Sequence, residues 1–241
     1  MNEIKLEERI AVALAKLILD PSAPPARHIA VGAASPMPAA ACWLVKKQGN
    51  PVRLSLLHKR SGNPFTEGTR ELFDLTGQGR IDLFFLGGGQ IDGSANLNLV
   101  GTGEWPGMGV RFPGSFGSAF MYFMTPRTIL FREEHTPRVF VEKVDNISAP
   151  GVSPPGVFRR GTAQALVTGR CVFRFHPDRA RFSLESVRET TGFTFDVTGD
   201  VPFTPDPTAE ELALLRGPIC DEMMETYPEF CARVFGRKQA A

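Results

Sequence analysis

Residues 81–98, IDLFFLGGGQIDGSANLN, decide the fold of this chain. The first half of this stretch is an apolar run of the length of a buried strand, and it ends at three consecutive glycines, Gly87, Gly88 and Gly89. Because glycine has no Cβ, the backbone there can adopt positive φ and a ligand can approach its amides closely. In open α/β sheets, ligands bind just beyond the carboxyl ends of strands. The stretch therefore predicts a strand that leads into a ligand-binding loop.

Two interpretations of this glycine loop stay open at this point. Polar residues follow the glycines at spacings that can place their side chains on the rim of a binding site: Gln90, Asp92, Asn96 and Asn98. Alternatively, the loop is a tight turn with solvated polar residues. The glycine spacing fits neither G-x-G-x-x-G nor the P-loop, so for an isolated loop the second interpretation is favoured.

The composition is that of a globular protein and excludes several other classes. The chain has 241 residues, of which 42% are hydrophobic and 22% charged. This length allows one α/β domain or two closely packed lobes, and we expect a single domain spanning residues 1–241. A net charge of +1, with no basic stripe among aromatics, argues against nucleic acid as a partner. The cysteines and histidines lack metal-ligand spacing, so we expect no metal site and no disulfide framework. They are Cys42, Cys171, Cys220, Cys231, His28, His58, His135 and His176.

The first residues argue against a membrane or a secretory role. Acidic residues (Glu3, Glu7, Glu8) stand where a signal peptide would be basic. The apolar run at 10–19 is about half of the ~20 residues needed to cross a bilayer. We therefore expect a cytoplasmic protein.

Helices and strands alternate in the first half of the chain, which predicts βαβ units and a mainly parallel open sheet. The expected order is helix 3–19, strand 28–32, helix 39–47, strand 52–57, helix 65–76 and the strand before the glycines. The second half is β-rich, with strands expected at 128–131, 139–141, 165–168, 171–175 and 181–184. A proline- and glycine-rich loop is expected at 146–161, and two helices at 208–216 and 219–235, broken at Gly217-Pro218.

Four stretches, in order, resemble the β subunits of class I (glutaconate-type) CoA-transferases. They are FFLGGGQIDGSANLN (84–98), RFPGSFGSAF (111–120), RTILFREEHTPRVFVEKVDNISAPG (127–151), and TGFTFDV (191–197) with PDPTAEELALLR (205–216). The resemblance implies the open α/β sheet shared by CoA-transferases and ribose-5-phosphate isomerase, with a β-rich C-terminal half. It also implies an acyl-CoA thioester as substrate, no permanently bound cofactor, and a separate α-type subunit in an α2β2 heterotetramer.

The resemblance also implies a mechanism whose central residue is missing here. Members use a glutamate of this subunit as a nucleophile, which forms an anhydride and then a glutamyl-CoA thioester. The corresponding position falls at or near His58, and no acidic residue lies between Pro51 and Gly62. Either the partner supplies a carboxylate, or the fold now performs hydrolytic ring opening or decarboxylation of a CoA-linked acid, or the chain is a non-catalytic assembly subunit. A sugar-phosphate binding module is a more distant fourth reading, because no Lys or Arg follows the glycines.

His58 is the candidate catalytic residue, as a general base that activates water. The alternative is a surface histidine that forms a basic cluster with Lys59 and Arg60 for the phosphates of CoA. The candidate substrate- and CoA-binding residues are Gly88, Gly89, Gln90, Ser115 and Gly117, the last two on a second glycine turn that would face the first.

Two further features of the sequence bear on the site. Ala95 stands where the family has glycine, so the loop after Asp92 is expected to run differently. Four phenylalanines near the second glycine turn form core, a subunit interface or an acyl pocket, with core favoured: Phe112, Phe116, Phe120 and Phe123. His135 is expected to be solvated in a loop.

Overall fold

Strand β3 (Leu83–Leu86), which precedes the glycines, lies inside a seven-stranded sheet of order β11-β10-β9-β8-β3-β1-β2. This is a computed structural model, and it describes residues 3–176, 181–183, 190–197 and 202–237. The other strands of the sheet are β1 (His28–Val31), β2 (Arg53–Leu56), β8 (Arg127–Arg132), β9 (Thr162–Thr168), β10 (Val172–His176) and β11 (Arg181–Ser183). Strands β2, β1, β3, β8 and β9 are parallel, while β10 and β11 add on antiparallel. The predicted open, mainly parallel sheet is confirmed.

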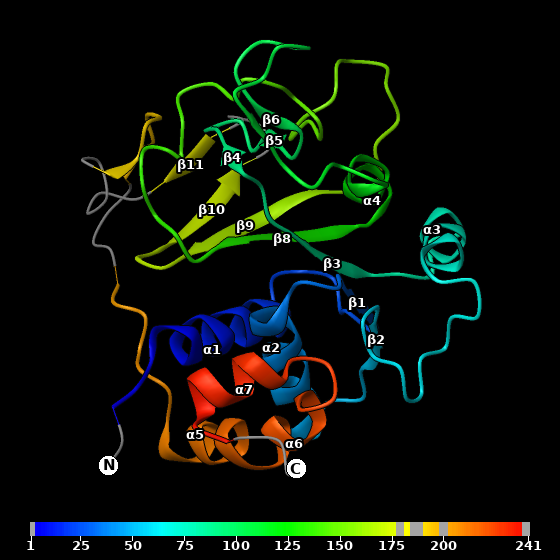
Figure 1. Cartoon of the computed structure of the whole chain (residues 1–241), viewed down its shortest axis with the longest axis vertical. Helices are drawn as coiled ribbons and strands as arrows, with labels where there is room; N and C mark the ends of the chain where they lie inside the picture. The colour runs from blue at the N-terminus through cyan, green and yellow to red at the C-terminus, as the bar shows by residue number, and fades with distance from the viewer. Residues whose placement is uncertain (1–2, 177–180, 184–189, 198–201, 238–241) are drawn as a thin grey trace.

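Helices pack in two further layers below the sheet in the view of Figure 1. Helices α1 (Leu6–Ile18) and α2 (Pro36–Lys47) bury apolar side chains against one face of the sheet, and α5 (Ala209–Leu214), α6 (Cys220–Met223) and α7 (Pro228–Phe235) pack beneath them. The chain kinks between α5 and α6 at Gly217, whose φ of −106° and ψ of −108° are not helical and which precedes Pro218. The break predicted at these two residues is confirmed.

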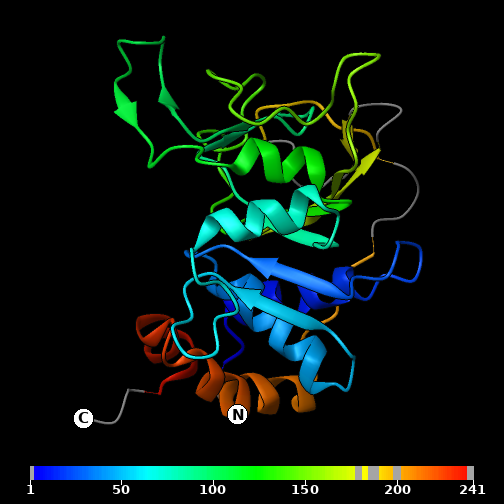
Figure 2. The ribbon, with the colours of Figure 1, turned by 90° about the vertical axis from the view of Figure 1, so that its right-hand side faces the viewer.

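The opposite face of the sheet carries helices α3 (Thr69–Gly77) and α4 (Ser118–Met124) and two small hairpins. The hairpins are β4 (Gln90–Ile91) with β5 (Leu97–Asn98), and β6 (Gly101–Thr102) with β7 (Val110–Arg111). Figure 2 shows the β6–β7 hairpin extending away from the body of the molecule. A second apolar core, which includes Tyr122, Phe140 and Phe173, lies on this face.

Ion pairs join the first helix to the last ones. Glu8 on α1 is fully buried, and both its carboxylate oxygens accept hydrogen bonds from Arg216, at 2.6 and 2.8 Å. Glu7 pairs with Arg233 of α7 in the same way. Because a buried charge is costly unless it is paired, these contacts fix α1 against the C-terminal helices.

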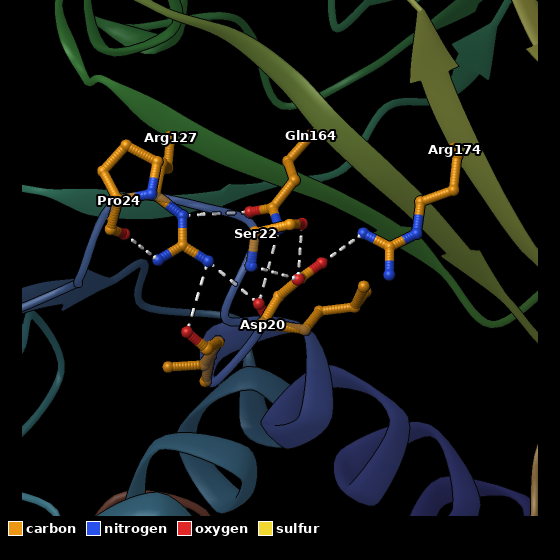
Figure 3. Close-up of polar contacts among 8 residues, drawn as sticks. Asp20, Ser22, Pro24, Arg127, Gln164 and Arg174 are labelled. Carbon is orange, nitrogen blue, oxygen red and sulfur yellow. Dashed lines mark hydrogen bonds and ion pairs between the residues drawn. The ribbon is translucent and has the colours of Figure 1, made fainter.

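The amino end of β8 is held by a buried arginine (Figure 3). Arg127 is 4% exposed, and its guanidinium donates to the carbonyl oxygens of Leu17, Ile18 and Pro24 and to Oε1 of Gln164. The guanidinium therefore satisfies carbonyls at the end of α1, which have no partners within the helix. Nearby, Asp20 pairs with Arg174 at 2.6 Å and accepts from Ser22. These hydrogen bonds lower the pKa of Asp20 to about 2.

Three predictions from the sequence were wrong, two about secondary structure and one about the burial of His135. Residues 139–141 do not form a strand, because Phe140 makes only an isolated bridge to Ile91 while its ring is buried in the core. The helix expected at 219–235 is two helices, since the chain turns before Pro228, which begins α7. His135 is 6% exposed and not solvated, with its ring nitrogens 2.8 Å from Oγ1 of Thr168 and 3.0 Å from Oγ1 of Thr191.

Candidate functional site

The order of the strands places a reversal of direction between β1 and β3. From β1 the chain moves outward to β2, then returns past β1 to β3 and continues through β8 to β9. Open α/β sheets bind ligands at such a reversal, beyond the carboxyl ends of the strands. Here these ends lead into Gly32 after β1 and into the glycine run Gly87–Gly89 after β3.

Two amides of the glycine run are free. Among the described residues, the backbone N–H groups of Gly87 and Gly88 have no hydrogen-bond acceptor, whereas the N–H of Gly89 donates to the Asn98 carbonyl at 2.9 Å. Gly88 is buried, and buried N–H groups without a partner are rare in proteins. Two consecutive free donors at the carboxyl end of a strand can hold a carbonyl oxygen that gains negative charge.

Close neighbours require glycine at two positions of the run. A Cβ on Gly88 would lie 2.7 Å from the carbonyl oxygen of Gln90, and one on Gly89 would lie 2.2 Å from the ring of Phe112. The Phe112 ring, which follows β7 directly, therefore packs against the backbone at Gly89. Phe112 is half-buried in this position.

The polar residues after the glycines build the loop. Gln90 and Asn98 are 6% and 0% exposed, and Oε1 of Gln90 accepts from Asn98 Nδ2 at 2.7 Å and from the Asp145 amide at 3.0 Å. The carboxylate of Asp92 accepts from the amides of Ser94 and Asn96 and from the Asn96 side chain. The side chains of Gln90, Asp92 and Asn98 are buried, as in the interpretation of the loop as a tight turn, while the binding role of Gln90 stays a prediction. Gln90 Nε2 makes no hydrogen bond to any described residue.

Ala95 takes a backbone conformation that favours glycine. Its φ is +59°, in the left-handed region, and its carbonyl accepts a hydrogen bond from the Tyr122 hydroxyl at 3.1 Å. The backbone of Gly151 also packs closely against this turn, since a Cβ on Gly151 would lie 2.0 Å from the Ser94 carbonyl oxygen. These contacts hold Ala95 in the left-handed conformation, and the expectation that the loop after Asp92 runs differently from that of the family stays a prediction.

His58 lies in the turn directly after β2 and is exposed. Strand β1 separates β2 from β3, so His58 is two strands away from the glycine run, and the structure does not bring the two into contact. The following residues are fixed by Glu225, whose carboxylate accepts from the Arg60 amide at 3.0 Å and from the Ser61 amide at 2.8 Å, as well as from the Ser61 hydroxyl. The hydrogen bonds from Ser61 lower the pKa of Glu225.

The second glycine turn packs against α3. A Cβ on Gly117 would lie 2.2 Å from the Phe73 ring, and the Ser115 carbonyl accepts a hydrogen bond from the Ser118 amide at the start of α4. The nearby phenylalanines do not form one pocket. Phe116 and Phe120 are 75% and 41% exposed and contact Phe73; Phe123 lies beside Arg159, and Phe112 against Gly89.

Other features contribute no site near the glycine run. No group of three or more potential metal-ligating side chains occurs within residues 3–176, 181–183, 190–197 and 202–237. Cys42, Cys220 and Cys231 are buried thiols. A hollow lined by Ile4, Arg9 and Leu212, among others, lies between the start of α1 and α5, in the helical layers. No helix among the described residues has the length and apolarity to span a bilayer.

Glu225 and Phe112 are the residues of this region that sequence reasoning missed. Glu225 stands 164 residues after Ser61, in the turn between α6 and α7, and no local motif relates the two. In the sequence Phe112 is one of four phenylalanines near the second glycine turn, and its contact with Gly89 becomes visible only in the structure.

Comparison with known proteins identifies the class of this fold. No protein-family model matches the chain. Among solved structures, glutaconate CoA-transferase from Acidaminococcus fermentans aligns over 89% of this chain and 94% of its own, with a TM-score of 0.73 and 23% identity. IpdAB from Rhodococcus jostii RHA1 gives a TM-score of 0.73 at 24% identity over 90% and 94% of the chains. The decarboxylase AibA/AibB gives 0.72 at 21% over 89% and 94%. The fold is therefore that of CoA-transferase subunits and their structural relatives.

The curated proteins that resemble this chain in sequence are B-type subunits of CoA-transferases. The chain is 31% identical over 145 residues to the B-type subunit of glutaconate CoA-transferase from Acidaminococcus fermentans, covering 53% of this chain and 54% of that protein. It is 30% identical over 157 residues to the B-type subunit of 3-oxoadipate CoA-transferase from Pseudomonas knackmussii, covering 57% and 58%. The chain thus spans just over half the length of these curated relatives. The predicted resemblance to CoA-transferase β subunits is confirmed.

Proposed function

We propose that this chain is the β-type subunit of a heteromeric class I CoA-transferase-like enzyme that acts on an acyl-CoA thioester. The observation that carries the proposal is the pair of free amides at Gly87 and Gly88, at the carboxyl end of β3 beside the strand reversal. These amides would hold the thioester oxygen as it becomes an oxyanion, for which one donor is typically worth ~3 kcal/mol. The absence of a side chain lets the thioester approach the backbone.

The proposal includes a separate α-type subunit in an α2β2 assembly. Its support is that the curated relatives are B-type subunits. In the transferase form of the proposal, the partner supplies the nucleophilic carboxylate, because residues 52–61 contain no acid. The enzyme carboxylate attacks the acyl-CoA carbonyl and displaces CoA as thiolate, which leaves a mixed anhydride. The thiolate then attacks the enzyme-derived carbonyl of this anhydride, which releases the first acid and leaves an enzyme–CoA thioester, and the acceptor carboxylate receives CoA by the reverse of these steps.

A hydrolase or decarboxylase of a CoA-linked acid is the second candidate. The imidazole of His58 is exposed at the carboxyl end of β2 and can deprotonate water, but β1 lies between it and the Gly87 and Gly88 amides. It would therefore serve as the base of a hydrolase only if the thioester carbonyl lay at the end of β2. A decarboxylase is among the structural neighbours, which shows that the fold is compatible with that reaction in another protein.

Trapping of the intermediate distinguishes these functions. The chain, co-purified with its α-type subunit, is incubated with an acyl-CoA and then with hydroxylamine, and both polypeptides are mapped by peptide mass spectrometry. A transferase gives a hydroxamate on one carboxylate. A hydrolase releases CoA with no acceptor acid present and incorporates ¹⁸O from solvent. If neither product forms with any acyl-CoA and Gly88→Ala binds CoA thioesters as the parent does, the proposal is wrong.

A further inference from the structure

Three lysine side chains converge on one tryptophan beside the loop that carries His58. Trp43 lies on α2, and Lys46 and Lys47 follow at i+3 and i+4, the spacings that place side chains on the same face of a helix. Lys59 comes from the loop after β2. The three Nζ atoms lie 5.4, 5.6 and 5.2 Å from the centroid of the indole ring, within cation–π distance. We call these four residues the lysine–tryptophan cluster.

The positive charge of this cluster is only partly compensated. Glu222 pairs with Lys47 at 3.1 Å and with Lys59 at 3.5 Å. Lys46 has no ion-pair partner among the described residues. Glu225 is also close to Lys59, whose charge contributes to its lowered pKa, while the neighbouring Arg60 side chain pairs with no described carboxylate. The four cationic side chains here are those of Lys46, Lys47, Lys59 and Arg60. The two carboxylates near them, Glu222 and Glu225, leave two positive charges in excess.

Two observations indicate that this cluster is more than a solvated face. The side chain of Lys59 is only 21% exposed, so its ammonium is held at the protein surface and not in bulk water. The indole N–H of Trp43 is buried and has no hydrogen-bond acceptor in the described structure. A group with several oxygen acceptors and two negative charges matches the excess charge and the ammonium donors of the lysines, and a phosphate has this chemistry.

We propose that the lysine–tryptophan cluster binds the phosphates at the nucleotide end of a CoA thioester. This inference rests on the proposed function, because it assigns the other end of the same substrate. The ends of β2 and β3 are separated by β1, which corresponds to about 10 Å across the sheet. The pantetheine arm of CoA, which joins the thioester to the nucleotide, would then run across the end of β1 from the Gly87 and Gly88 amides towards Lys59.

Tryptophan fluorescence tests the cluster directly in the isolated chain. The sequence contains two tryptophans, so in Trp105→Phe the emission comes from Trp43 alone. We expect adenosine 3′,5′-bisphosphate, at fixed ionic strength, to change this emission saturably, and neutral adenosine to leave it unchanged. In the same background, Lys46→Gln with Lys59→Gln should weaken binding at least 10-fold, whereas Lys46→Arg with Lys59→Arg should retain it within about threefold.

Lys16→Gln is the matched control, since Lys16 is an exposed lysine on α1 whose loss removes the same kind of charge. It should bind the bisphosphate as the parent does. Inorganic phosphate distinguishes the two sources of the ligand: we expect it to bind at least 10-fold more weakly than the bisphosphate. Equal affinity for both would overturn the nucleotide assignment. A bisphosphate affinity unchanged in the double Gln variant, with its melting temperature preserved, would overturn the site.

The assembled enzyme separates a failure of this inference from a failure of the proposed function. If the complex turns over an acyl-CoA and the double Gln variant leaves KM for that thioester unchanged, the cluster is not the subsite while the function stands. If the isolated chain binds the bisphosphate at the cluster but the complex processes no CoA thioester, the proposed function is wrong and the anion site remains. A rise in KM of at least 10-fold with kcat unchanged supports both.

Discussion

Replacing Arg127 by methionine removes a buried positive charge and keeps the apolar stem of the side chain. The guanidinium donates to Leu17 at 2.9 Å, Ile18 at 3.2 Å, Pro24 at 2.5 Å and Gln164 at 3.0 Å (Figure 3). Methionine leaves all four acceptors without this donor. Three of them are backbone carbonyls: that of Leu17 keeps the Asp20 amide at 3.3 Å, that of Pro24 belongs to an exposed residue, and that of Ile18 is buried.

The expected loss of stability follows from these four bonds. An acceptor left buried and unpaired costs ~1–3 kcal/mol, and the variant no longer bears the desolvation of a charge that burial already disfavours, as the lowered pKa of Arg127 indicates. We therefore expect the free energy of unfolding to fall by about 3–4 kcal/mol. In a domain of this size each kcal/mol changes Tm by ~2–4 °C. The melting temperature should fall by roughly 6–15 °C.

Thermal unfolding followed by circular dichroism measures this loss. Arg127→Lys, which keeps the charge but cannot reach every acceptor, should lie between the parent and Arg127→Met. Arg70→Met is the matched control, because the Arg70 side chain is 76% exposed and its pair with Glu67 contributes at most ~1 kcal/mol. A melting temperature of Arg127→Met within about 2 °C of the parent would refute the role assigned to this arginine.

Three further predictions concern His135, the glycine run and His58. Burial lowers the pKa of His135 to about 4, below the ordinary 6.5 of the unfolded chain, so the unfolded state binds the proton first as pH falls. The free energy of unfolding, measured by urea titration, should thus decrease by up to about 3 kcal/mol from pH 6.5 to pH 4. In His135→Gln this decrease should be smaller. If the free energies of the parent and the variant fall in parallel with pH, the role assigned to His135 is wrong. Gly89→Ala should cost ~1–3 kcal/mol because the new Cβ meets the Phe112 ring, and Phe112→Ala in the same chain should recover most of that cost, whereas additive effects would show that the ring is elsewhere. His58→Ala should leave Tm unchanged, since the side chain is exposed; in the assembled enzyme it should abolish hydrolysis if His58 is the base, and unchanged turnover ends that hypothesis.

The arrangement of the sheet was predictable because it follows from local patterns. The apolar run 81–86 and the three glycines located β3 and its carboxyl end, and the helix expected from residue 208 is interrupted at Gly217-Pro218 as predicted. The strand predicted around Phe140 was wrong because a β-prone residue can be buried by core packing outside a strand. The solvated position predicted for His135 was wrong because hydrogen bonds to Thr168 and Thr191, which are distant in sequence, make burial of an imidazole acceptable.

The candidate site was less predictable, because its geometry depends on contacts between distant residues. The glycines indicated a loop, but which of their amides are free depends on Asn98, and the left-handed backbone at Ala95 depends on Tyr122. Gln90 reads as a polar ligand in the sequence and is a loop-building residue in the structure. The roles of the candidate site residues stay predictions: His58 in catalysis, and Gly88, Gly89, Gln90, Ser115 and Gly117 in binding substrate.

The anchoring of the His58 loop by Glu225 has a consequence for protein engineering. A chimera that exchanges residues 51–68 with a related chain would import a loop without its cap, since the carboxylate that accepts the amides of Arg60 and Ser61 comes from the turn between α6 and α7. Transplanting the loop together with residues 220–228 moves both halves of the contact. Variants designed by loop exchange on this fold should therefore replace these two distant segments together.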